Sequence, residues 1–222
     1  ALVALGGNRT FTVADDGSTA VDLTVSSIIS GAFNLTKDGA GTFTLTGSNT
    51  YSGLTTVSAG ILRAGIDNAL STGGLTVNGG TYDIGTFSDG VGVVTLTSGS
   101  ITGSTGVLTG TSYAVASGTI SAILGGTGTL TKTTGGTVVL TGVNTYTGLT
   151  TVSTGTLQAG VNNALSTGGL TVNGGTYDIG TFTDTVGAVT LTSGSITGTT
   201  GVLTGTSYAV EAGTFNGIGS TG

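Results

Sequence analysis

The feature that most constrains the fold is a repeat of the chain upon itself. Residues 31–125 align with residues 126–220 without a gap at an offset of 95 positions, and 69 of these 95 positions are identical. The twenty letters NALSTGGLTVNGGTYDIGTF stand unchanged at 68–87 and again at 163–182. Self-similarity at a fixed period predicts a repeat architecture, in which each repeat buries its apolar face by stacking on its neighbours.

A shorter period lies inside the long one. Ten glycines recur at spacings of 18 to 20 residues, and we interpret them as the structural register: Gly41, Gly60, Gly80, Gly99, Gly118, Gly136, Gly155, Gly175, Gly194 and Gly213. Two positions after each glycine stands an apolar or aromatic residue, from Phe43 to Phe215. Three positions before most of them stands Val or Leu, and the two exceptions are Asp38 and Thr133. These positions predict inward-facing columns.

Local alternation identifies the element type. Segments such as GTFTLTG and VVTLTSGS alternate apolar and polar residues with period two, which indicates strands, and Gly, Asn and Ser interrupt them at turn spacing. We therefore predict an all-β fold, a parallel β-helix (β-solenoid) with coils of about 19 residues and roughly 11 coils. Residues 1–30 form a partial repeat, 31–125 the first repeat and 126–220 the second, in one continuous solenoid domain.

Composition removes several functional classes. The chain has no His and no Cys, which excludes Ser-His-Asp and Cys-His catalysis and zinc clusters. Four cations against ten acidic residues, a net charge of −6, do not suit nucleic acid. No stretch of eighteen apolar residues exists, so no transmembrane helix is expected, and we expect no cofactor. The first residues, ALVALGGNRTF, lack a signal-peptide pattern, which suggests a mature chain or a segment of a longer one.

Two stretches resemble a known family. LTKDGAGTFTLTGSNTYSGLTTVSAGILRAG (35–65) and LTKTTGGTVVLTGVNTYTGLTTVSTGTLQAG (130–160) are similar to the autotransporter-associated β-strand repeat. The second copy departs from the motif at Thr133 and Thr134. The resemblance implies a right-handed parallel β-helix in a passenger exported across a Gram-negative outer membrane, hence an extracellular or outer-membrane surface location. It carries no catalytic residues over to this chain.

The acidic residues offer the one route left to catalysis. Asp83 and Asp89 recur as Asp178 and Asp184, and paired carboxylates are the chemistry of glycoside cleavage. The structural interpretation is favoured: Tyr82 faces inward, so Asp83 faces outward, and Asp89 lies in a Ser-Asp-Gly turn. For the alternative role in binding a ligand, the candidate residues are Tyr82, Asp83, Tyr177 and Asp178.

Other tyrosines and ligands are weaker candidates. Tyr51, Tyr146, Tyr113 and Tyr208 are expected to pack near coil corners in preference to stacking on sugars. Repeated calcium loops have a period of nine residues with Asp in each, which is not found here, although Asp15 and Asp16 leave an isolated ion site open. An ice-binding face needs aligned T-x-T pairs on successive coils, and neighbouring segments lack them.

The sequence thus predicts a structural role and no enzymatic one. We expect a solenoid stalk or fibre segment of a secreted or surface-displayed bacterial protein, with end-to-end self-assembly as a further expectation. The alternative is a glycan-binding or host-binding adhesive module, and a polysaccharide-degrading enzyme is the least favoured. Expected partners are a second copy of the chain or an extracellular or host surface.

Overall fold

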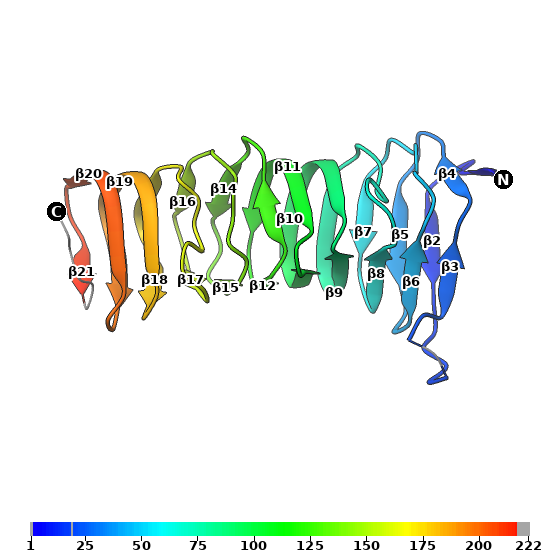
Figure 1. The fold of residues 1–222 in the computed structure, drawn as a ribbon, viewed down its shortest axis with the longest axis horizontal. Coiled ribbons are helices and arrows are strands. Elements are labelled where there is room, and N and C mark those ends of the chain that lie inside the picture. The colour runs from blue at the N-terminus through cyan, green and yellow to red at the C-terminus, as the bar shows by residue number, and fades with distance from the viewer. Residues whose placement is uncertain (1, 19, 217–222) are drawn as a thin grey trace.

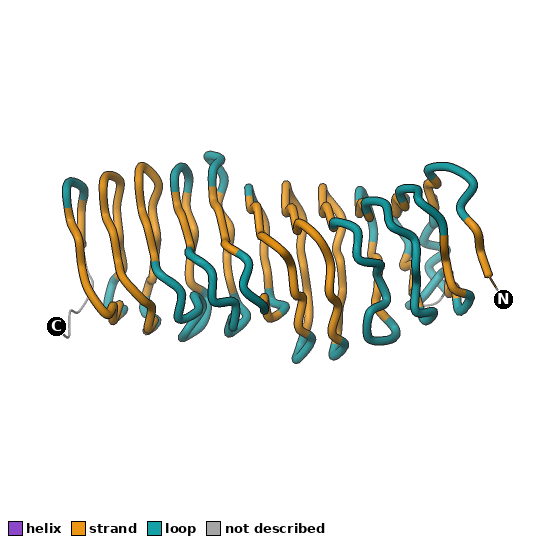
Figure 2. Tube along the Cα trace, turned by 90° about the horizontal axis from the view of Figure 1, so that it is seen from above, coloured by secondary structure: helices purple, strands orange, loops and turns teal. Residues whose placement is uncertain are grey.

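The computed structural model describes residues 2–18 and 20–216, which form a rod of stacked coils with the two ends of the chain at opposite ends of the rod (Figure 1). Strands run along the long sides of the coils and loops form many of the corners, while in several coils a strand continues around a corner (Figure 2). No helix occurs in this described part, and so none that is long and apolar enough to cross a membrane. The strands are β1 (Leu2–Ala4), β2 (Arg9–Thr12), β3 (Leu23–Val25), β4 (Ile28–Ser30), β5 (Leu35–Asp38), β6 (Thr42–Leu45), β7 (Thr55–Val57), β8 (Ile61–Ala64), β9 (Leu75–Gly85), β10 (Ser88–Gly103), β11 (Val107–Val115), β12 (Gly118–Ile120), β13 (Ile123–Gly125), β14 (Thr129–Lys132), β15 (Thr137–Leu140), β16 (Thr150–Val152), β17 (Thr156–Ala159), β18 (Leu170–Gly180), β19 (Thr183–Gly198), β20 (Val202–Val210) and β21 (Thr214–Asn216).

The strands pair in parallel with strands about one coil away. β5 pairs with β7 and β7 with β9 on one side of the rod, while β6 pairs with β8 and β8 with β9 on the other. The prediction of an all-β parallel solenoid with coils of about 19 residues is confirmed, and the rod has about 10 turns, slightly fewer than predicted. Parallel strands cannot be joined by a tight hairpin and need a longer connection between them. In this rod the rest of each coil, with its corners, is that connection.

One inward column runs the whole length of the rod. Successive register partners along it are Phe11, Lys37, Val57, Val77, Leu96, Val115, Lys132, Val152, Val172, Leu191 and Val210. The exceptions Asp38 and Thr133 are thereby explained, because the residue before each of them, Lys37 or Lys132, takes the inward place. Both lysines are completely buried. The column is therefore apolar except for one lysine in each repeat.

A second inward column contains the residues that follow the register glycines. Phe43, Leu62 and Tyr82 are register neighbours in it, and Ile101 follows; all four are completely buried. Between the repeats the register slips by two residues, so that Ile120 pairs with Leu140 and Gly118 with Val138. A slip of two keeps every side chain on its own face of the sheet, so the core continues through the junction.

Threonines form one regular column on the outer surface. Its register partners, here called the threonine column, are Thr10, Thr36, Thr56, Thr76, Thr95, Ala114, Thr131, Thr151, Thr171, Thr190 and Ala209. The sequence comparison missed this alignment. Among the described residues no second threonine column lies beside it, because Leu54, Val93 and Leu149 interrupt the neighbouring outward positions. The paired T-x-T array of an ice-binding face is therefore not formed.

The register glycines are explained by one feature, the close approach of neighbouring coils at these positions. Six of the ten have positive φ, for example Gly213 with φ 121°. A Cβ built on Gly213 would lie 2.7 Å from the carbonyl oxygen of Gly194, one coil earlier, and one on Gly80 would lie 3.0 Å from that of Gly60. A side chain at these positions would push neighbouring coils apart. Positive φ alone does not explain Gly41, Gly80, Gly136 and Gly175, because their φ is not positive.

Candidate functional site

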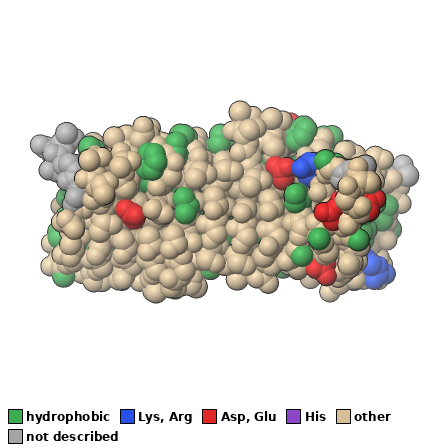
Figure 3. All heavy atoms as spheres, turned by 90° about the horizontal axis from the view of Figure 1, so that it is seen from below, with side chains coloured by type: hydrophobic (Ala, Val, Ile, Leu, Met, Phe, Trp, Pro, Cys, Tyr) green, Lys and Arg blue, Asp and Glu red, His purple; other side chains and the backbone are tan. Residues whose placement is uncertain are grey.

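The outward residues Asp83 and Asp178 occupy equivalent places on β9 and β18. Asp83 accepts a hydrogen bond from Arg63 Nε at 3.0 Å, forming an ion pair, and one from the Gly85 amide at 3.1 Å. Asp178 accepts from Gln158 Nε2 at 3.2 Å. Charged side chains are sparse on the face shown in Figure 3 and gather toward the N-terminal end of the rod. Each candidate carboxylate is thus partly exposed and already paired with the coil before it.

Tyr82 and Tyr177 differ from their acidic neighbours in being completely buried. Their rings lie in the inward column, and each hydroxyl donates a short hydrogen bond to a carboxylate, Asp89 or Asp184. A ring without exposed surface cannot stack on a ligand. The structure therefore removes both tyrosines from the predicted ligand-binding set and leaves Asp83 and Asp178.

Asp89 and Asp184 are the main correction to the sequence analysis. Asp89 was expected in a Ser-Asp-Gly turn, but it and its equivalent Asp184 lie within β10 and β19 and are 2% and 1% exposed. Besides the tyrosine hydroxyl, each accepts a hydrogen bond from a main-chain amide, that of Leu70 or of Leu165, at 3.2 Å. Burial raises the pKa of each carboxyl to about 6, and the hydrogen bonds oppose this shift.

The buried position also decides against glycoside chemistry at these pairs. Asp89 lies inside the rod, while Asp83, next to inward-facing Tyr82, lies on the outer surface of the same coil. Two carboxylates on opposite sides of a sheet cannot flank one glycosidic bond. The repeated pair in the second unit, Asp178 and Asp184, has the same arrangement.

The buried lysines cap main-chain carbonyls at a coil corner. Lys37 Nζ donates to the carbonyl oxygens of Asp38 at 2.9 Å, Gly39 at 2.7 Å and Ala59 at 3.1 Å. Lys132 Nζ donates to those of Thr134 and Thr154. Desolvation lowers the pKa of both lysines, and near Lys37 the charges of Asp38 and Asp22 oppose the shift. These ammonium groups hold a corner together and are not accessible to a ligand.

Asp15, Asp16 and Asp22 form an acidic cluster at the N-terminal end. Each offers one carboxylate oxygen within 4.8 Å of the others, which is a geometry that suits a hard cation. All three carboxylates already accept hydrogen bonds from main-chain amides, those of Gly17, Ser18 and Thr42. The bonds from Ser18 lower the pKa of Asp16. Asp15 and Asp16 therefore serve a local turn and Asp22 links two neighbouring coils, and the cluster is the one group of this kind among residues 2–18 and 20–216.

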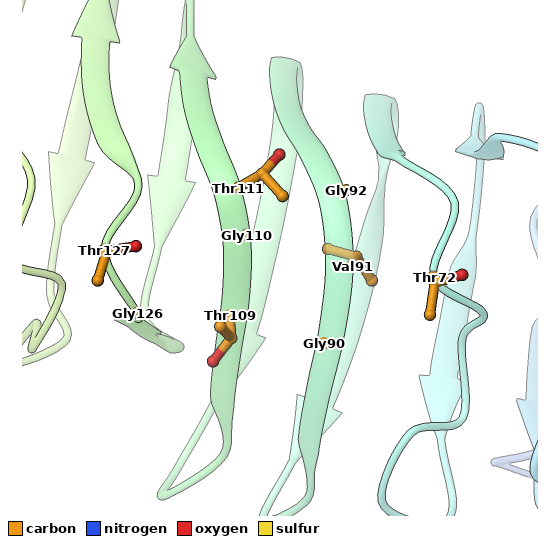
Figure 4. Close-up of a pocket in the computed structure, with 9 residues that line it drawn as sticks. All are labelled: Thr72, Gly90, Val91, Gly92, Thr109, Gly110, Thr111, Gly126 and Thr127. Carbon is orange, nitrogen blue, oxygen red and sulfur yellow. The ribbon is translucent and has the colours of Figure 1, made fainter.

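A shallow hollow of about 550 Å³ lies over the strands β10 and β11. Its floor is Gly90, Val91 and Gly92 of β10 with Thr109, Gly110 and Thr111 of β11, and its walls are Thr72 on one side and Gly126 and Thr127 on the other (Figure 4). Three of the six floor residues are glycines, so main chain is exposed there. The lining contains no charged group and no aromatic ring, so it lacks the chemistry that fixes a sugar or an ion.

The fold and its polar groups define a repeat protein whose side chains serve coil stacking. Residues 35–64 and 130–159 match the passenger-associated-transport-repeat family. The chain thus contains this passenger-associated repeat twice, once in each 95-residue unit. It is also 44% identical over 97 residues to the Adhesin BmaC autotransporter of Brucella suis biovar 1 (strain 1330), a match that covers 44% of this chain and 3% of that protein. No solved structure matches the chain.

Two signals in the sequence could have revealed the buried polar residues. Lys37 follows inward Leu35 by two positions, and in a strand residues two apart share a face. Asp89 has the same relation to inward Val91. Asp89 was assigned to a turn and Lys37 was given no placement, so this periodicity was not used.

Proposed function

We propose that this chain is a length-determining shaft segment of a surface-displayed or secreted passenger protein. The observation that carries the proposal is the unbroken parallel ladder from β2 to β21 with its continuous inward columns. Such a ladder makes a stiff rod whose length grows with the number of coils, by about 4.8 Å per coil. The matched repeat family and the similarity to an autotransporter adhesin support a place in a passenger of this kind.

Deleting one whole repeat tests the mechanical part of the proposal. Removal of residues 31–125 joins residue 30 to Gly126, which is equivalent to Gly31, and preserves the register. The rod should shorten by roughly 24 Å, five coils of about 4.8 Å, and stay folded. Small-angle X-ray scattering measures the longest dimension. A deletion of residues 31–78 serves as the control, because it removes a half-integral number of coils and should prevent regular stacking.

The same deletion in the parent passenger tests the role at the cell. An epitope beyond the shaft should remain displayed but move closer to the surface, measured by immunoelectron microscopy. Loss of a specific adhesion while epitope position and fold are unchanged would contradict a purely mechanical role and would favour the adhesive alternative.

End-to-end stacking is a second proposal, motivated by the last described coil. Tyr208, Val210 and Phe215 are 41%, 54% and 36% exposed. Their equivalents in the first repeat, Tyr113, Val115 and Ile120, are buried beneath the next coil. A further coil, from the same chain or from a second molecule, would cover this surface. Sedimentation velocity of the isolated segment, with and without Val210→Asp, tests whether a second molecule covers this surface. Association that the substitution abolishes supports end-to-end stacking, and a monomer at all concentrations contradicts it.

A further inference from the structure

The buried Asp–Tyr pairs contact the loop at one corner of each repeat. This corner loop comprises residues 66–71 in the first repeat and 161–166 in the second. In the first, the Leu70 amide donates to Asp89 Oδ1, and the Asn68 amide donates to the carbonyl oxygen of Ser88, next to Asp89, at 2.7 Å. From the coil on the other side, Asn49 Nδ2 donates to the carbonyl oxygen of Ala69.

The corner loop depends on these contacts because its own conformation is unfavourable. Asn68 has φ 53° and Asn163 has φ 54°, and they are the two non-glycine residues with positive φ in the described part of the chain. The second repeat repeats the contacts: Leu165 donates to Asp184, Asn163 to the carbonyl oxygen of Thr183, and Asn144 to that of Ala164. A loop in a left-handed conformation must be held by its surroundings.

The surroundings of each carboxyl contain no positive charge. Asp89 faces the Tyr82 hydroxyl from β9, Leu108 from β11, Tyr51 from the preceding coil, and the negative charge of Asp67 from the corner loop. Asp184 faces the corresponding groups, Tyr177, Leu203 and Tyr146, with neutral Asn162 in place of Asp67. In the described structure no lysine or arginine makes an ion pair or hydrogen bond with either carboxyl. A buried carboxyl without a cation favours its protonated form.

We propose that each repeat contains a proton-operated clamp, formed by Asp89 with Tyr82 and by Asp184 with Tyr177, which holds the corner loop more firmly in mildly acidic than in neutral solution. The clamp is independent of the shaft role. The direction follows from linkage: the folded-state pKa of about 6 exceeds the ordinary value of 3.8, so the folded chain binds the proton more tightly. The resulting stabilisation is complete below about 3.8 and is lost as the pH rises through about 6.

Urea unfolding at pH 7.5 and pH 5.0 tests the clamp. Acidification should raise the folding equilibrium constant of the unaltered chain by roughly tenfold for each clamp relative to the Asp89→Asn, Asp184→Asn double variant. The matched control is Asp83→Asn with Asp178→Asn, which removes the outward carboxylates of the same coils and should keep the full acid response. An identical pH dependence of the unaltered chain and the Asp89→Asn, Asp184→Asn variant would overturn the proposal.

Two measurements on the folded chain keep the test decisive if the Asn variant does not fold. Carboxyl ¹³C NMR should show two aspartates titrating near pH 6, and Tyr82→Phe with Tyr177→Phe should move both midpoints upward, because the tyrosine bonds stabilise the ionised form. Hydrogen-exchange protection of the Leu70 and Leu165 amides, corrected for intrinsic rates, should increase at pH 5. Midpoints near or below 4, or protection that does not change, would overturn the clamp.

Discussion

The two repeats of this chain have the same interior but different charges on the surface. Lys37 and Asp89 reappear inside the second repeat as Lys132 and Asp184, and Asp184 repeats the hydrogen bonds of Asp89. Three charged residues of the first repeat are replaced by neutral ones in the second: Asp38 by Thr133, Arg63 by Gln158 and Asp67 by Asn162. The buried polar groups therefore belong to the architecture, since both repeats use them, whereas the surface charges can be exchanged without changing the coil.

The largest expected effect tests the part of the comparison in which the repeats agree. In Gly99→Ala the new Cβ would overlap the carbonyl oxygen of Gly80, and the backbone has φ 89°. We expect a loss of about 3 kcal/mol in the free energy of unfolding, from the left-handed backbone and the displaced coil together. Gly194→Ala, with φ 85° and the same contact to Gly175, should cost about as much. Urea denaturation followed by circular dichroism measures both.

The control is Gly90→Ala, whose Cβ would have its nearest neighbour at 3.9 Å. The second repeat already has Thr185 at this position, so a change within about 0.5 kcal/mol is expected. Equal losses at Gly99 and Gly90 would show that close approach of the coils is not what selects glycine.

The buried lysines give the next largest effect and separate the two repeats. Lys37→Met removes three hydrogen bonds to carbonyls and the attraction of Asp38 and Asp22, whereas Lys132→Met removes two bonds and no such attraction. Lys37→Met should therefore be more destabilising than Lys132→Met by about 1 kcal/mol in the free energy of unfolding. Thermal unfolding of the two variants compares them directly, and the reverse order would mean that the acidic neighbours of Lys37 contribute nothing.

The fold was predictable because its signals recur in every coil. The glycine period and the alternation fixed the strands, the coil length and the inward column that contains Leu62 and Ile101. Sequence alone did not show the alignment of coils, so the threonine column stayed hidden: its members, such as Thr56 and Thr76, stand in segments that differ around them. Register between coils is set by hydrogen bonding and corner length, which a repeat count only approximates.

The buried polar residues were harder to predict because charged side chains usually lie on the surface. Lys and Asp are rarely buried, so Asp89 was assigned to a turn and Lys37 was overlooked. Asp89 can be buried because a tyrosine hydroxyl and a corner amide donate hydrogen bonds to it, and Lys37 can be buried because main-chain carbonyls at a corner accept its hydrogen bonds. Asp83 was placed correctly on the surface, but its pairing with Arg63 depends on which residue stands one coil earlier.

Exchanging the surface partners of Asp83 and Asp178 tests how far the charges are interchangeable. Arg63→Gln gives the first repeat the pair of the second, and Gln158→Arg does the reverse. The first should lose and the second gain no more than about 0.5 kcal/mol, and the difference should disappear in 1 M salt, because exposed ion pairs are weak and screened. Thermal melts at low and high salt measure this. A loss above about 2 kcal/mol would show that the ion pair is part of the architecture.

The smallest expected effect concerns Asp67, whose negative charge raises the pKa of Asp89 further than burial alone. The second repeat has neutral Asn162 at that place, so the Asp89 carboxyl should titrate at a slightly higher pH than that of Asp184. Asp67→Asn should remove this difference, lowering the Asp89 midpoint by a few tenths of a pH unit and leaving Asp184 unchanged, because the Coulomb term between partly solvated charges is small. Carboxyl ¹³C titration resolves shifts of this size. Equal midpoints before the substitution would mean that solvent at the corner screens Asp67, and the two clamps would then differ in sequence but not in proton affinity.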